Sequence, residues 1–165
     1  MDSSTTTLII GSSMVRGLHL RGKGNKTLCF PGAKVVDLSW MLPTILVKHP
    51  NLLTLVLHIG ANDVYMSEAL RSNLSELLTT LKSKGPRIIM SGPLPTHRKG
   101  DMRWSRHFHL HRWLSTFCSL NKLAYVNNFP LFTPHLPQLL RADGLHTNSE
   151  GTKLLAYNIK KVADS

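Results

Sequence analysis

The stretch NLLTLVLHIG, residues 51–60, holds the pattern that decides the fold. Its side chains are apolar at nearly every position rather than at every second one, which is typical of a β-strand buried on both faces. Shorter apolar runs recur at residues 6–10, 26–30, 87–92 and 123–128. Together these runs predict a parallel sheet of about five strands.

Helical patterns separate the expected strands. Residues 67–85 form the clearest one, because leucines share one helical face and Gly85 ends the pattern. Those leucines are Leu70, Leu74, Leu77, Leu78 and Leu81. Further helices are expected at residues 13–20, 35–46, 102–121 and 152–162. The alternation of strands and helices predicts an α/β fold with helices on both faces of the sheet, in one domain spanning residues 1–165.

Two of these helices have features that can be tested. Pro43 is expected to start, end or kink the helix at residues 35–46, because proline lacks a backbone N–H. In the helix at residues 102–121, one face is expected to pack into the core. Its members are Leu110, Trp113, Leu114 and Phe117.

The composition is that of a folded but strongly basic protein. The 165 residues include 20 Lys and Arg against 9 Asp and Glu, for a net charge of +11. Such a field attracts polyanions, so nucleic acid, an anionic membrane surface or an acidic partner is an expected contact. Specific recognition of bases is not expected.

The cysteines and the N-terminus indicate an intracellular, cytoplasmic setting. Cys29 and Cys118 do not form a C-x-x-C pair, so neither a disulfide framework nor a thiolate metal site is predicted. Cys118 is expected to be a buried small apolar residue. The first residues lack a basic segment, and their apolar run stops at Gly11, unlike a signal peptide.

In parallel sheets, active sites lie beyond the carboxyl ends of the strands, so the residues that follow each strand matter most. Ser12 and Ser13 follow the first strand, and Gly32 follows the second. Asn62 comes directly after the stretch at residues 51–60. Each residue also has a structural interpretation, because serine caps helices, glycine forms turns, and asparagine is common in turns.

The segment RADGLHTNSEG, residues 141–151, adds Asp143 and His146 before the last helix. Thr147 and Glu150 are spaced as a capping box, so the segment is also readable as a helix start alone. Taken together, the strand ends supply a hydroxyl, a glycine N–H, an amide and an Asp/His pair. Those are the parts of an acyl-transfer site, in which a histidine activates a serine and N–H donors stabilise the oxyanion.

The stretches GSSMVRGL, PGA, GAND and DGLH resemble, in order and spacing, the four sequence blocks of the SGNH (GDSL-type) hydrolases. The resemblance implies a flavodoxin-like three-layer α/β/α sandwich, a serine esterase activity and no cofactor or metal. By that match Ser13 is the nucleophile, His146 the base and Asp143 its orienting partner. The oxyanion hole is implied to consist of the N–H of Ser13, Gly32 and Asn62.

A closer resemblance is to the esterase domain of the first-ORF protein of fish LINE retrotransposons, through CFPGAKVVDL, LHIGANDV, SGPLPTHRKGD and RADGLHTNSEG. It implies hydrolysis of small acyl esters such as acetyl esters, or of lipid substrates. It also implies a parent protein that binds nucleic acid and self-associates. Ser12 departs from the G-D-S pattern, whose Asp braces the site. The alternative hypothesis is therefore a weak or inactive module that binds nucleic acid or anionic lipid.

Residues 96–113 are rich in basic and aromatic side chains. Arg98, Lys99, Arg103 and Arg106 are the candidates for polyanion contact, although the segment is also readable as a lid over the site. His107, His109 and His111 lie in the same segment, and His107 and His111 share a helical face as zinc ligands can. No carboxylate or thiolate accompanies them as a ligand there, so a solvated basic face is expected instead.

Overall fold

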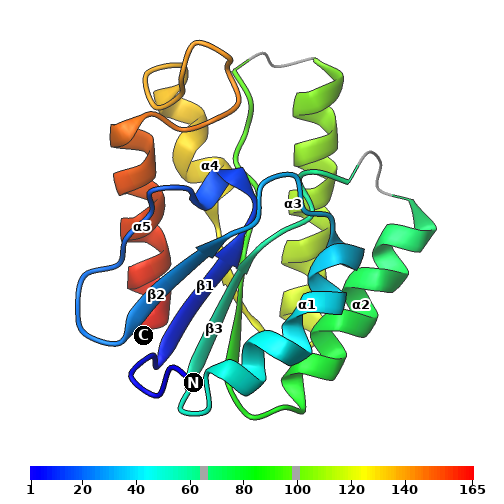
Figure 1. The fold of residues 1–165 in the computed structure, drawn as a ribbon. Helices are drawn as coiled ribbons and strands as arrows, with labels where there is room; N and C mark the ends of the chain where they lie inside the picture. Colours follow the sequence, from blue (N-terminus) through cyan, green and yellow to red (C-terminus); the bar gives the residue numbers. More distant parts are fainter. Residues whose placement is uncertain (64–66, 98–100) are drawn as a thin grey trace.

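A computed structural model describes residues 1–63, 67–97 and 101–165, and Figure 1 shows its fold. Five parallel strands form one sheet in the order β2-β1-β3-β4-β5. They are β1 (Thr7–Gly11), β2 (Asn25–Cys29), β3 (Thr54–His58), β4 (Arg87–Ser91) and β5 (Ala124–Val126). This is the flavodoxin-like strand order, and it confirms the predicted fold class.

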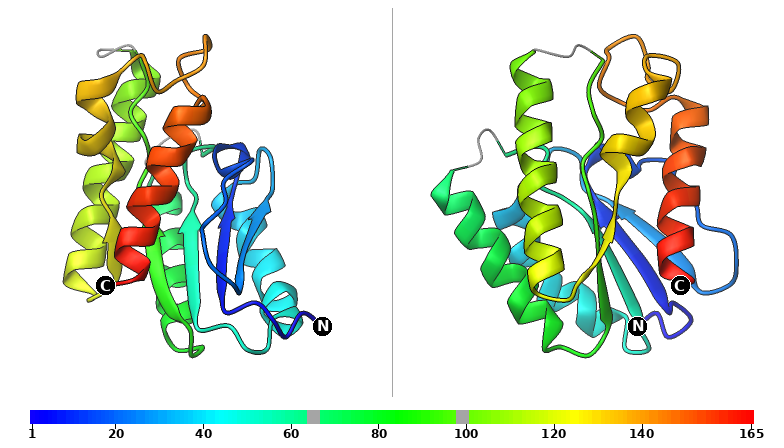
Figure 2. Two further views of the ribbon diagram at one scale, coloured as in Figure 1. Left: turned by 90° about the vertical axis from the view of Figure 1, so that its left-hand side faces the viewer. Right: turned by 180° about the vertical axis from the view of Figure 1, so that it is seen from behind.

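Helices cover both faces of the sheet, as Figure 2 shows from the side and from behind. One face packs against α1 (Val35–Lys48), α2 (Glu68–Lys82) and α3 (Met102–Leu120). The other face packs against α4 (Asn128–Phe132) and α5 (Ser149–Ala163). Alternate residues of β3 point to the two sides, so Leu55 and Leu57 join the first core and Val56 joins the second. The near-continuous apolar pattern of this strand follows from that double burial.

The α2 leucines confirm the predicted stripe, since Leu70, Leu74, Leu77, Leu78 and Leu81 are all buried. In α3, Leu110 and Leu114 are buried, while Trp113 and Phe117 are partly buried against the same core. Cys118 is also fully buried, as expected. Burial raises the pKa of its thiol to about 11, so it stays protonated at neutral pH.

Three local predictions need correction. Residues 13–20 form only a short 3₁₀ turn, η1 (Ser13–Val15), because Gly17 follows with a positive φ of 75°. Helix α1 neither starts nor ends at Pro43, because its buried face continues past the proline to Ile45, and a kink at this residue stays a prediction. Packing of that face outweighs the loss of one backbone hydrogen bond.

The helix start at the C-terminal end of the chain is one residue later than the predicted capping box. Asn148 is the N-cap of α5, and its side-chain oxygen accepts a hydrogen bond from the Gly151 N–H at 2.9 Å. Thr147 instead shares a hydrogen bond with the Thr152 hydroxyl at 2.8 Å. Asparagine is at least as good a cap as threonine, which explains the shift.

Both chain termini lie at the amino-terminal end of the sheet (Figure 1). The backbone N–H of Asp2 donates to the Lys48 carbonyl at the end of α1. Arg87, at the start of β4, donates through Nη1 to the carbonyl of Ala163 at 3.2 Å. The loops that carry the predicted site residues lie at the opposite end of the strands. Within the described ranges, no helix is long and apolar enough to cross a membrane.

Candidate active site

The strand order places the first part of the site. The chain leaves β1 toward β2 on one side, whereas β3 pairs with β1 on the other. A crevice forms at such a switch point, beyond the carboxyl ends of the two central strands. Ser13 is the second residue after β1, and Asn62 is the fourth residue after β3. Both residues line a cavity of about 230 Å³ at this place.

Gly11 ends β1 and allows the tight turn into η1. A Cβ at this position would lie 2.8 Å from Val15 Cγ1 and 3.0 Å from the His58 carbonyl oxygen. A side chain at position 11 would therefore push the turn that presents Ser13 away from β3. Ser12 is the N-cap of η1, yet its side chain makes no capping hydrogen bond. The capping interpretation of this serine pair is not supported for Ser12.

The structure brings Ser13, His146 and Asp143 together across 133 residues of chain. Ser13 Oγ lies 3.0 Å from His146 Nε2, and His146 Nδ1 lies 2.7 Å from Asp143 Oδ2. The other carboxylate oxygen, Asp143 Oδ1, accepts hydrogen bonds from the N–H groups of Leu145 and His146. The hydrogen bond with His146, and then that from the Leu145 N–H, lower the pKa of Asp143 to about 2.

An ionised Asp143 determines which nitrogen of His146 is protonated. A carboxylate can only accept, so Nδ1 must carry the proton that lies between the two groups. Nε2 then presents its lone pair to the Ser13 hydroxyl. This is the arrangement in which a histidine can take the proton of a serine.

Asn62 is oriented by the loop that contains Gly32. Its side-chain nitrogen donates to the Ala33 carbonyl at 3.1 Å, and Ala33 directly follows Gly32. Gly32 has a positive φ of 75° and no atom near its Cβ position, so its backbone is open to approach. Within the described part of the chain, Gly32 is not among the residues that line the 230 Å³ cavity. Its assignment to the oxyanion hole stays a prediction.

Asp63 ties the β3 loop to α1. Its Oδ2 accepts a hydrogen bond from the N–H of Val35, the first residue of that helix. Burial raises the pKa of Asp63, and the Val35 hydrogen bond opposes that change. This contact holds the neighbouring Asn62 at the cavity.

A buried polar chain lies beneath the site. His58 Nδ1 is 2.8 Å from Ser91 Oγ, which also accepts from the Asn128 side chain, and Asn158 donates to Asn128 in turn. Burial, and then the neighbouring His107, lower the pKa of His58 to about 4, so it is neutral at neutral pH. Among residues 1–63, 67–97 and 101–165, no group of His, Cys, Asp or Glu side chains is arranged to hold a metal ion.

The histidines of α3 do not form the predicted solvated face. His107 is buried, and its Nδ1 lies 2.9 Å from the Leu94 carbonyl oxygen. His111 Nδ1 is 2.8 Å from the Tyr125 hydroxyl, and only His109 is exposed. The prediction was wrong for His107 because this residue shares a helical face with Leu110, Leu114 and Cys118. That spacing was a signal in the sequence that could have revealed its burial.

The basic segment divides into two parts. Arg103 and Arg106 line the 230 Å³ cavity together with Ser13 and His146. Arg98 and Lys99 lie outside the described residues. Of the aromatic residues in this segment, Trp104 stacks on Phe108 with ring centroids 5.2 Å apart.

Sequence reasoning missed four more residues of the site. Met14 and Leu145 contribute apolar wall to the main cavity. Arg16 and Arg141 line a smaller hollow that is also lined by Ser13 and His146. A larger hollow of about 640 Å³, between residues 17–21 and α5, is lined by neither Ser13 nor His146. We therefore place the candidate site at the smaller cavities, where the reactive groups are.

Comparisons with known proteins identify relatives of this chain. The chain is 40% identical to the esterase domain of the ORF1 protein from the zebrafish ZfL2-1 retrotransposon, covering 97% of this chain and 99% of that one, with a TM-score of 0.55. The chain belongs to the SGNH hydrolase family. This match confirms the predicted resemblance to the esterase domain of the first-ORF protein of fish LINE retrotransposons.

More distant SGNH hydrolases share the fold. A lipase/acylhydrolase from Enterococcus faecalis is 21% identical, covers 95% of this chain and 94% of its own, and has a TM-score of 0.78. A member of the lipolytic G-D-S-L family from Veillonella parvula is 16% identical. The match covers 96% of this chain and 98% of that one, with a TM-score of 0.78. No protein-family model and no curated protein sequence matches the chain. The family membership supports a hydrolase function.

Proposed function

We propose that this SGNH hydrolase is a serine esterase that cleaves small acyl esters, such as acetyl esters. The observation that supports this most is the hydrogen-bonded series from Ser13 Oγ to His146 Nε2 at 3.0 Å and from His146 Nδ1 to Asp143 at 2.7 Å. A serine hydroxyl is a weak nucleophile until a base of this kind takes its proton. The small cavity beside Ser13, about 230 Å³, suits a short acyl group better than a long chain.

In the proposed reaction, Ser13 Oγ attacks the ester carbonyl carbon while its proton passes to His146 Nε2. The negative charge on the carbonyl oxygen is stabilised by the Asn62 amide and by the N–H groups of Ser13 and Gly32. The bond to the alcohol then breaks, and the alcohol leaves with the proton from His146. Water, deprotonated by the same histidine, attacks the acyl-serine. The bond between the acyl carbon and Ser13 Oγ then breaks, His146 returns the proton to Oγ, and the acid leaves. Asp143 stabilises the imidazolium in both steps.

Ser12 occupies the position where the family pattern has an aspartate. Its backbone carbonyl accepts hydrogen bonds from the Val15 N–H at 3.1 Å and from Cys29 Sγ at 3.3 Å. These contacts connect η1 with β2 without any carboxylate. They support a site that is held in shape by the backbone at this position.

The test is hydrolysis of p-nitrophenyl acetate by the wild type and by Ser13→Ala, His146→Ala and Ser12→Ala. We expect the first two variants to lose activity by a factor of about 10³ or more, and Ser12→Ala to keep most of it. Labelling by a fluorophosphonate probe, which reacts with activated serines, should be lost only in Ser13→Ala and His146→Ala. A wild type that is neither faster than folded His146→Ala nor labelled would favour the alternative of an inactive binding module.

A further inference from the structure

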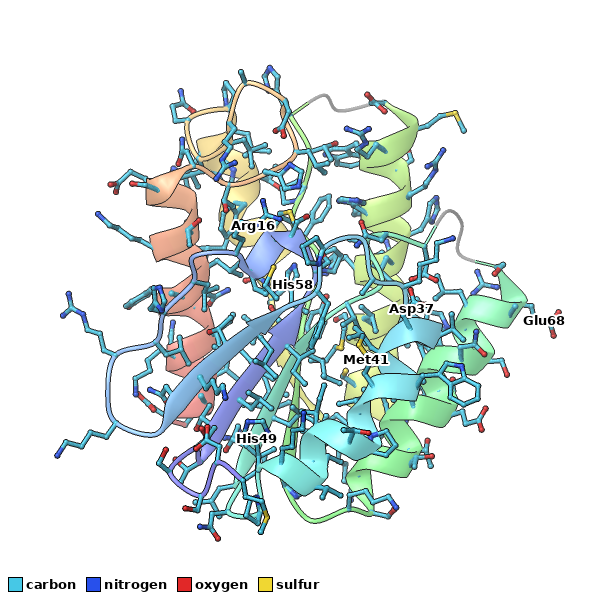
Figure 3. All side chains as sticks on the ribbon, in the orientation of Figure 1. Arg16, Asp37, Met41, His49, His58 and Glu68 are labelled. Carbon is cyan, nitrogen blue, oxygen red and sulfur yellow. The ribbon has the colours of Figure 1, made fainter. Side chains whose placement is uncertain are left out.

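Arginines line both of the spaces that contain the Ser13–His146 pair. The cavity of about 230 Å³, which also contains Asn62, is lined by Arg103 and Arg106 from α3. A second hollow of about 80 Å³ is lined by Ser13, His146 and Thr147 together with Arg16 and Arg141. Figure 3 shows Arg16 above the carboxyl ends of the strands, at the same end of the sheet as His58. We call these two spaces the main cavity and the side hollow.

Few negative charges at the site offset these arginines. Within the described part of the chain, no carboxylate lies within ion-pair distance of the guanidinium groups of Arg16, Arg103 or Arg141. Asp143 is engaged by His146 and by two backbone N–H groups. Asp63 lines the main cavity, where its Oδ2 accepts a hydrogen bond from the Val35 N–H, but it is not among the residues that line the side hollow.

The two spaces have different chemical roles in the proposed reaction. The main cavity contains Asn62 and therefore takes the carbonyl oxygen and the acyl group. His146 lines both spaces, whereas Asn62 lines only the main cavity, so the side hollow is left for the other part of the ester. Because His146 must protonate the departing oxygen, the alcohol part of the ester leaves along this side. Arg16 and Arg141 are thus the side chains that the alcohol part meets.

We propose that the natural substrate is an anionic ester, with a phosphate or carboxylate group in its alcohol part that is bound by Arg16 and Arg141. This inference rests on the proposed esterase function. Guanidinium groups bind both anions through paired N–H donors, and a cleft of one charge sign concentrates ligands of the other. The acyl group itself stays small and uncharged.

The experiment uses four acetyl esters of similar shape that differ in charge. 3-Acetoxybenzamide is neutral, 3-acetoxybenzoate carries a carboxylate, 3-acetoxyphenyl phosphate carries a phosphate, and (3-acetoxyphenyl)trimethylammonium is a cation. Each kcat/KM is divided by the rate of the imidazole-catalysed reaction, which removes differences in intrinsic reactivity. The wild type should favour at least one anionic ester over the neutral ester by about tenfold or more and should disfavour the cation.

The variants locate the source of that preference. In Arg16→Gln/Arg141→Gln the ratio of anionic to neutral kcat/KM should fall to within about threefold of one. Taking the ratio cancels any loss of folded enzyme that affects both esters. Arg16→Lys/Arg141→Lys keeps the charge and should keep most of the preference. Lys48→Gln/Lys84→Gln removes the same charge at the far end of the sheet and should leave the ratio unchanged.

The outcomes separate this inference from the esterase proposal. Hydrolysis of the neutral ester above the level of Ser13→Ala, without any preference for anions, would leave the esterase standing and overturn the inference. So would a preference that Lys48→Gln/Lys84→Gln reduces as much as Arg16→Gln/Arg141→Gln does, since the overall charge would then explain it. The charge of p-nitrophenyl hemisuccinate is in its acyl part. A preference for this ester over p-nitrophenyl acetate that is stronger than the preference for the anionic acetyl esters over the neutral one would overturn the assignment to the side hollow. Inactivity on every ester together with absent fluorophosphonate labelling would reject the esterase itself.

Discussion

Replacing Asp143 by asparagine tests the role of the carboxylate most directly, because the new side chain has the same shape. The amide oxygen can still accept from the N–H groups of Leu145 and His146, as Asp143 Oδ1 does now. The amide nitrogen would then face His146 Nδ1 at the present distance of 2.7 Å. Since an amide nitrogen only donates, Nδ1 would have to accept and Nε2 would carry the proton.

That tautomer cannot serve as a base. With a proton on Nε2, His146 would donate to Ser13 Oγ across the 3.0 Å contact rather than take its proton. We expect Asp143→Asn to lower kcat at neutral pH by a factor of about 10² to 10⁴, or roughly 3 to 5 kcal/mol of barrier. Asp143→Ala should be less damaging. The Asp143 side chain is 46% exposed, so water can occupy the vacated place without forcing the wrong tautomer.

The assay is the initial rate of p-nitrophenyl acetate hydrolysis between pH 6 and 9, with urea unfolding of each variant as a check on folding. Asp143 also contributes to stability, because its pKa is lowered to about 2 in the folded protein. This contribution is present above pH 3.8, the ordinary value, and is lost as the pH falls through about 2. Screening of so exposed a carboxylate limits it to about 1 kcal/mol or less. An Asp143→Asn enzyme as active as Asp143→Ala, or more so, would refute the tautomer argument.

Three further predictions concern the scaffold. Leu74→Ala, at a fully buried position of α2, should lower the free energy of unfolding in urea by about 2 to 5 kcal/mol, whereas Leu53→Ala, at a position 67% exposed, should change it by less than about 0.5 kcal/mol. Gly11→Ala should lower the free energy of unfolding by about 1 to 3 kcal/mol and reduce esterase activity. Adding Val15→Ala should recover part of that activity by removing the nearest methyl groups, and purely additive losses of activity would contradict this. Because the pKa of Asp63 is raised in the folded state, its ionisation destabilises the fold as the pH rises above 3.8. Asp63→Asn should therefore gain stability relative to the wild type between pH 4 and 7, and a constant difference over that range would count against it.

The positions of the proposed nucleophile and its partners were predictable because topology determines them. Parallel strands bring their carboxyl ends to one edge of the sheet. Residues that follow β1 and β3, and those of the loop before α5, must therefore converge there. That is why Ser13, Asn62 and His146 lie at one cavity despite their separation in sequence. The apolar runs were equally informative, since burial on both faces leaves no other pattern for a strand.

The surroundings of the site were not predictable in the same way. Arg16 follows η1, whereas Arg141 lies before the last helix. Nothing in their spacing in the sequence shows that both line the same hollow. Their placement depends on how two irregular loops pack, which has no periodicity. The short helix α4 was not predicted, because Pro130 lies within its five residues. His107 was missed for a different reason, since its polar side chain hid a position on the buried face of α3.

The location of the two termini has a practical consequence. Both ends of the chain leave from the amino-terminal end of the sheet, while Ser13 and His146 face the other way. Any polypeptide or surface joined to either end would therefore meet the side of the molecule that faces away from the cleft. The chain can be tethered from its N-terminus, its C-terminus or both, and the face that carries the candidate site remains turned away from the anchor. If the proposed esterase function holds, an immobilised form should accordingly give the same kcat/KM on soluble esters whichever end is attached.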